Sequence, residues 1–198
     1  MSAMRITNLN PDHDIGASAW MLSVDGHQLL MDAGTHPKRE GLSSLPLYES
    51  VKDLEVDAIA LTHCHHDHVG SLPVALQYFP HARVIMTDLS YFIVERVLHN
   101  SVNVMLKRRD QGVSGYPLFT HREVDVATRR WTVAPVRQRF DISGDRLAPG
   151  EDAEVSLEFF DAGHILGSAG TLLRAHGKTI FYTGDVNFED QTVMKGAD

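Results

Sequence analysis

One short segment of the chain concentrates side chains that bind metal ions. It reads His63-Cys64-His65-His66-Asp67-His68 and directly follows the apolar residues 58–61. Residues two apart on an extended chain point the same way, so His63 and His65 can bind one ion together. Asp67 and His68 lie where the chain turns into the next element, and they can face a second ion. Zinc prefers such ligands, and two adjacent ions can hold the attacking and leaving oxygens of a hydrolytic reaction.

The alternative explanation for this segment is a histidine-rich surface loop that collects stray metal. The dense, ordered spacing after a run typical of a buried strand favours a built site. Cys64 and His66 alternate away from the candidate ligands, so we predict that Cys64 is no ligand and that His66 supports a ligand or faces solvent. The other histidines are scattered, and we interpret them as surface or loop residues. They are His13, His27, His36, His81, His99, His121 and His176.

Three further residues at predicted strand exits could complete such a centre. Asp32 follows an apolar run and can orient a ligating histidine through its second ring nitrogen, although a cap or turn role is the alternative. His164 lies among glycines, whose permissive backbone suits a tight loop, and it can complete a three-nitrogen group with His63 and His65. Asp185 follows another predicted strand and can place one oxygen on each ion.

Composition predicts an ordinary globular domain spanning residues 1–198. Hydrophobic residues make up 43% and charged residues 22%, which is typical of a folded domain. Because no run of eighteen apolar residues occurs, we expect no membrane span, and residues 1–5 lack the apolar core of a signal peptide. The single cysteine, Cys64, excludes an internal disulfide and favours a reducing, cytoplasmic location.

Charge is unevenly distributed along the chain. The formal net charge of −8 argues against a nucleic-acid partner. Residues 107–139, however, contain eight basic and three acidic residues, a net charge of +5. Such a stretch can contact phosphates, so Lys107, Arg108 and Arg109 are candidate RNA contacts. A solvated helix surface is an equally good interpretation.

The hydrophobic pattern predicts alternating strands and helices. Strands are predicted at residues 5–9, 17–24, 27–31, 57–61, 83–86, 133–140, 154–160, 171–175 and 179–182. Helices are predicted at residues 46–54, 67–79 and 123–131, and a long one starts after Thr87 and Asp88, which can cap it. Apolar residues recur along that helix at helical spacing and indicate core packing. Asp25 and Gly26 predict a hairpin turn.

Taken together, these residues resemble the metallo-β-lactamase fold superfamily. The finer resemblance is to its β-CASP nucleases, particularly those like the endonuclease subunit of the cleavage and polyadenylation machinery. Asp32, the histidine cluster, His164 and Asp185 carry it. Residues 14–18, 31–37, 162–169 and 182–185 are also similar to family motifs. The resemblance spans nearly the whole chain and weakens between about residues 103 and 150.

The resemblance implies an α/β fold, a metallo-β-lactamase-like αββα sandwich of two mixed β-sheets flanked by helices. One zinc ion would be held by His63, His65 and His164. The implied reaction is hydrolysis of a phosphodiester bond in RNA by a metal-bound hydroxide, with RNA as the partner.

The second zinc ion would be held by Asp67 and His68, with Asp185 bridging both ions and Asp32 supporting them. Asp67 and Asp185 are therefore the candidate catalytic residues. Family members continue past the equivalent of Asp185 into a β-CASP domain and later motifs, which include the last ligand of the second zinc and a candidate general acid. No residue here matches those motifs. We therefore expect the N-terminal part of such a catalytic domain, with a second zinc site that is one ligand short.

Two other functions remain open at this stage. A small-molecule hydrolase of the same fold, such as a thioesterase or lactonase, is favoured by the negative net charge and disfavoured by the loop around His164. A metal-binding module without turnover is the other alternative. The sequence also leaves open whether the chain forms a homodimer.

Overall fold

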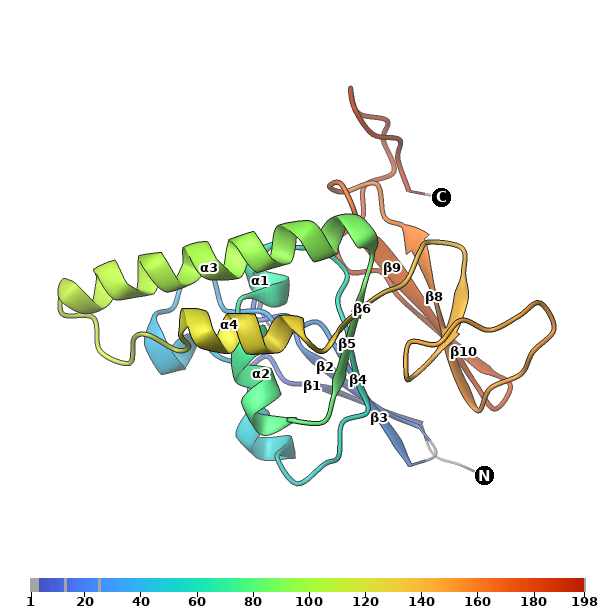
Figure 1. Ribbon diagram of the computed structural model, residues 1–198, viewed down its shortest axis with the longest axis horizontal. Helices are drawn as coiled ribbons and strands as arrows, with labels where there is room; N and C mark the ends of the chain where they lie inside the picture. The colour runs from blue at the N-terminus through green and yellow to red at the C-terminus, as the bar shows by residue number, and fades with distance from the viewer. Residues whose placement is uncertain (1–3, 13, 25, 198) are drawn as a thin grey trace.

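The computed structural model describes residues 4–12, 14–24 and 26–197. Two β-sheets pack face to face, and the helices lie on the outer side of the first sheet (Figure 1). This arrangement confirms the predicted α/β class and the metallo-β-lactamase-like sandwich. The second sheet is antiparallel throughout, and in the described residues the helices cover only the first sheet.

The first sheet has six strands in chain order. They are β1 (Met4–Asn8), β2 (Trp20–Val24), β3 (His27–Met31), β4 (Ala58–Ala60), β5 (Arg83–Met86) and β6 (Trp131–Val133). Strands β1 to β3 pair antiparallel, and β3 to β6 pair parallel. The predicted hairpin joins β2 to β3, with Val24 opposite His27. Asp25 of its turn lies outside the described residues.

The second sheet has four strands, in the order β10-β9-β8-β7. They are β7 (Arg139–Asp141), β8 (Val155–Asp161), β9 (Ala169–Ala175) and β10 (Lys178–Tyr182). The turn between β9 and β10 at His176 and Gly177 has positive φ at both residues, as a tight two-residue hairpin requires.

The helices are α1 (His66–Val69), α2 (Leu72–Tyr78), α3 (Asp88–Asp110) and α4 (His121–Thr128). Thr87 caps α3, as predicted, because its side chain accepts a hydrogen bond from the Ser90 amide. The helix predicted at 67–79 is divided into α1 and α2 around Gly70 and Ser71. The helix predicted at 46–54 is only a short 3₁₀ turn, Tyr48–Val51, and a second such turn spans Gly41–Ser44.

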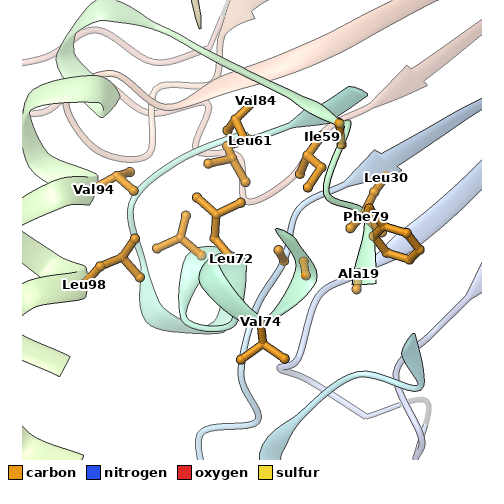
Figure 2. Packing of buried hydrophobic residues seen from close by; sticks show 14 of the residues in the cluster. Ala19, Leu30, Ile59, Leu61, Leu72, Val74, Phe79, Val84, Val94 and Leu98 are labelled. Carbon is orange, nitrogen blue, oxygen red and sulfur yellow. The ribbon is translucent and has the colours of Figure 1, made fainter. Parts of the chain in front are cut away.

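Two hydrophobic clusters hold the layers together. Because side chains alternate along a strand, Leu29 and Met31 enter the cluster between the sheets while Leu30 faces the helices. On the helix side, Leu72, Val94 and other helical side chains meet strand residues (Figure 2). The apolar positions predicted along α3 therefore pack in the core. Burial on both faces is typical of parallel strands covered by helices.

Two expectations about secondary structure were wrong. The predicted helix at 123–131 ends at Thr128, and Trp131 opens β6 instead. The predicted strand at 133–140 is interrupted, because Pro135 has no amide hydrogen to donate and Arg137 has φ 61°. His36 lies in a loop, which agrees with its interpretation as a surface or loop residue, and the loop buries it. In the described part of the chain, no helix combines the length and apolarity that crossing a membrane requires.

Candidate metal centre

Strand direction brings the candidate ligands to one edge of the sandwich. Strands β3 and β4 are parallel, so Asp32 after β3 and His63 after β4 lie at the same end. Strands β8 and β10 both pair antiparallel with β9 and therefore point the same way. His164 follows β8, and Asp185 follows β10. Residues more than a hundred positions apart in the chain are thus placed side by side.

Four of these side chains form a compact group. The ligand atoms of His63, His65, His164 and Asp185 all lie within 4.8 Å of one another. Nδ1 of His65 is 3.1 Å from Nε2 of His63 and 3.1 Å from Nε2 of His164. Oδ2 of Asp185 is 3.5 Å from Nε2 of His164 and 3.9 Å from Nε2 of His63. We call these residues the first group.

The spacing of the first group fits a tetrahedral cation. Zinc bonds of about 2.0–2.1 Å to nitrogen or oxygen place neighbouring ligand atoms about 3.3 Å apart. Four of the separations, from 3.1 to 3.9 Å, bracket that value. Three imidazole nitrogens and one carboxylate oxygen are also a suitable donor set for zinc. The residues present therefore fit a metal ion.

A second, looser group adjoins the first. Nε2 of His68 is 3.4 Å from Oδ1 of Asp185 and 4.0 Å from Oδ2 of Asp67. Asp185 therefore directs one carboxylate oxygen toward each group. We call Asp67, His68 and Oδ1 of Asp185 the second group.

Asp32 fixes the orientation of the second group from behind. Its buried carboxylate accepts hydrogen bonds from the Thr62 amide at 2.8 Å, from Nδ1 of His68 at 2.8 Å and from the Tyr182 hydroxyl at 3.0 Å. Because Nδ1 of His68 donates to Asp32, its Nε2 is the atom that faces Asp67 and Asp185. Asp32 has φ 59°, a left-handed conformation unusual for a non-glycine residue.

The histidines differ in their affinity for protons. Burial and the positive charge of neighbouring His68 lower the pKa of His63 to about 3, which keeps its nitrogen free to bind a cation. Burial alone would lower the pKa of His68, but the Asp32 carboxylate, with smaller contributions from Asp185 and Asp67, outweighs burial and raises that pKa to about 9. Burial also lowers the pKa of His164.

A comparison of the sequence with protein families identifies a family that matches nearly the whole chain. The family described as the metallo-beta-lactamase superfamily matches residues 14–197. The chain belongs to this superfamily. Solved structures show the same fold: a metallo-beta-lactamase from Cronobacter sakazakii with a mutated HARLDQ motif aligns at TM-score 0.53 and 20% identity, covering 85% of this chain and 57% of that one. A metallo hydrolase from the archaeon Ignicoccus hospitalis aligns at TM-score 0.52 and 16% identity, covering 93% and 61%.

Curated relatives of the chain are ribonucleases and RNA-processing subunits by name. It is 28% identical to an endoribonuclease, YSH1, of Eremothecium gossypii over 191 residues, 95% of this chain and 24% of that protein. It is 26% identical to the cleavage and polyadenylation specificity factor subunit 3-I of Arabidopsis thaliana over 194 residues, 98% of this chain and 26% of that protein. The chain therefore spans about a quarter of the length of these relatives.

Two glycines allow the close backbone contacts on which this metallo-β-lactamase site depends. A Cβ on Gly34 would overlap the backbone carbonyl of Asp67. Gly184 has φ +56°, and a Cβ there would lie 2.7 Å from Cβ of Thr62. Because Gly184 directly precedes Asp185, its contact with Thr62 brings that carboxylate against the first sheet.

The loop that carries His164 is anchored to the start of α3. The Gly167 carbonyl accepts hydrogen bonds from the Thr87 hydroxyl at 2.6 Å and the Ser90 hydroxyl at 2.9 Å. Oγ of Ser168 accepts from the His164 amide at 3.2 Å. The cap of α3 and the position of His164 are thus coupled.

Sequence reasoning missed several supporting residues. Thr62 and Tyr182 bind Asp32, yet neither a hydroxyl beside a histidine nor a strand tyrosine carries a distinctive pattern. His66 is hydrogen-bonded by Thr35 at 2.8 Å and by Ser101, which agrees with its predicted place outside the ligand set. Cys64 is buried in the helix-side cluster, and burial raises the pKa of its thiol.

The basic candidates lie apart from the first group. Lys107, Arg108 and Arg109 occupy the last turn of α3, at the end far from β8–β10 (Figure 1). Arg108 pairs with Glu40 at 2.6 Å, and Arg109 pairs with Asp110 at 2.9 Å. The ion pairs of Arg108 and Arg109 therefore involve none of the metal-ligand candidates.

Proposed function

We propose that this chain is the metal-binding part of a nuclease that hydrolyses phosphodiester bonds in RNA. The observation that carries the proposal is the Asp185 carboxylate, which directs one oxygen toward each histidine group. A shared carboxylate is the arrangement that a pair of adjacent cations needs. The names of the curated relatives support RNA as the substrate class.

In this proposal the cations are two zinc ions. His63, His65 and His164 hold the first, Asp67 and His68 hold the second, and Asp185 contacts both. When bound, such a pair neutralises charge on a phosphoryl group and lowers the pKa of a coordinated water.

The chain's own residues prepare the site in three ways. The low pKa of His63 keeps a ligand nitrogen unprotonated at neutral pH. Asp32 holds His68 in one ring orientation. The Asp67 side chain is 26% exposed. It can therefore contact solvent or substrate as well as a cation. The second group contains fewer ligands than the first, so we expect weaker binding there.

The decisive experiment combines metal analysis with RNA cleavage. We expect about two zinc ions per chain, and cleavage of a labelled single-stranded RNA that stops in chelator and returns with added zinc. Hydrolysis of thioesters or lactones with RNA left intact would instead support a small-molecule hydrolase, which the net charge of −8 favours. One ion per chain without turnover would indicate a metal-binding module.

The remaining expectations stay predictions: a single domain over residues 1–198, a cytoplasmic location and a possible homodimer. Size-exclusion chromatography with light scattering tests the homodimer directly.

A further inference from the structure

A long groove runs along α3 beside the metal centre. Its volume is about 780 Å³. One wall is the face of α3 from Ile93 to Arg108, and the other is the segment from Thr35 to Glu40. His66 and Asp67 also line it, and His66 is hydrogen-bonded to Ser101 near the middle of the α3 wall. We call this feature the α3 groove.

Basic side chains line the rim of the α3 groove. Lys38, Arg39, Arg96 and Arg108 all contribute. Arg39 and Arg108 are held by ion pairs with Asp12 and Glu40. Arg96 and Lys38 are exposed, and across residues 4–12, 14–24 and 26–197 no ion pair involves either side chain. Two cationic groups are therefore available for an anionic ligand.

The floor of the groove is apolar. Val97, Val104 and Tyr116 line it. The side chain of Val104 is 50% exposed although it is apolar. Exposed apolar surface between cationic groups matches the two parts of a nucleotide, since bases stack on apolar and aromatic side chains while phosphates pair with Lys and Arg. A duplex hides its base faces, so this floor favours a single strand.

The α3 groove is continuous with the metal centre through Asp67. The same residue also lines a hollow of about 520 Å³ on the other side, together with His68, Asp185 and Trp20. A single strand lying in the groove would therefore pass beside Asp67, a member of the second group. The hollow lined by His68, Asp185 and Trp20 would then hold the RNA nucleotides on the other side of the cleaved bond.

We propose that the α3 groove binds the nucleotides of single-stranded RNA that flank the scissile phosphate on one side. This inference rests on the proposed nuclease function. It also revises the basic candidates: of Lys107, Arg108 and Arg109, only Arg108 lines the groove, and Arg96 becomes the main phosphate contact.

The first test compares Arg96→Glu with Arg109→Glu, an exposed arginine on the same helix that does not line the groove. Binding of a fluorescein-labelled single-stranded 12-mer RNA is measured by anisotropy, in chelator to prevent cleavage, over a salt series. We expect Arg96→Glu to weaken binding by about tenfold and to reduce the salt slope by about 0.7, the loss of one phosphate contact. Arg109→Glu should stay within about twofold of wild type.

A second pair of variants tests the floor. Val104→Asp places a negative charge in the groove, and Val126→Asp does the same at a similarly exposed position on α4. Only Val104→Asp should weaken RNA binding. An equally strong affinity for duplex RNA would overturn the assignment of a single strand.

The outcomes separate this inference from the proposed function. If wild type cleaves RNA and Arg96→Glu and Val104→Asp bind like their controls, the groove assignment is wrong while the nuclease function stands. If wild type neither binds nor cleaves RNA, both proposals fail.

Discussion

The two proposed cation positions are built in different ways. The first group draws His63 and His65 from the first sheet and His164 from the second, and its ligand atoms lie within 4.8 Å. The second group takes Asp67 and His68 from one short segment and shares Asp185. The first position is thus defined by the packing of the two sheets, whereas the second depends on a hydrogen bond from His68 to Asp32.

The largest effect should come from the residue common to both positions. Asp185→Asn removes a negative charge and replaces one oxygen with an amide. We expect RNA cleavage to fall on the order of 10³-fold, because charge stabilisation by the cations is worth several kcal/mol, and both ions to bind more weakly. Steady-state kinetics and metal analysis measure this, with the exposed Asp152→Asn as control. Wild-type activity with two bound ions would show that Asp185 does not bridge.

His63→Ala should separate the positions. We expect loss of about one zinc ion, since His63 faces only the first group. The lost ion should cost about 2.7 kcal/mol of stability at a metal concentration 100 times Kd, or roughly 5–10 °C in Tm. Mass spectrometry and thermal melts with zinc test this against His81→Ala, an exposed histidine outside the site. Unchanged zinc content would contradict the ligand assignment.

Asp32→Asn should weaken the second position alone. Residues that orient a ligand typically contribute 10- to 100-fold in metal affinity, so competition with a chromophoric chelator should show one ion released more easily. Tyr182→Phe removes only one donor to Asp32 and should have a smaller effect. An equal loss at both positions would mean that Asp32 supports the whole centre rather than His68.

The smallest effect is expected for Ser101→Ala. This substitution removes the hydrogen bond from α3 to His66, which lies between His65 and Asp67. We expect a loss of about 1 kcal/mol and about 2–4 °C in Tm, with zinc content unchanged. Ser143→Ala, on an exposed loop, is the matched control. Release of zinc would show that His66 determines the position of its neighbours.

Much of the candidate site could be located from the sequence because several of its residues follow a strand with a clear apolar pattern. Asp32, His63, His164 and Asp185 are all predicted close after strands. Strands β3 and β4 point the same way, as do β8 and β10, so each pair ends at one edge of its sheet. The chemistry of the residue types then predicted that His63, His65, His164 and Asp185 would lie together, as they do, whereas their roles as ligands stay predictions.

What the sequence could not predict depends on tertiary contacts. The burial of His36 could not be predicted from the residues around it, because a loop has no regular hydrophobic pattern. Trp131 continues an apolar pattern after α4, and its place in β6 is decided by pairing with Val84. The α3 groove could not be predicted either. Lys38 and Arg96 are 58 positions apart in the chain, and only the fold places them along the same groove.

Because the first group takes ligands from both sheets, a bound cation would be a reversible cross-link between them. Its removal should then loosen the sandwich at this edge before the hydrophobic interior opens. Amide hydrogen exchange would register this as faster exchange after β8 and β10, so the metal state could be followed through backbone motion alone.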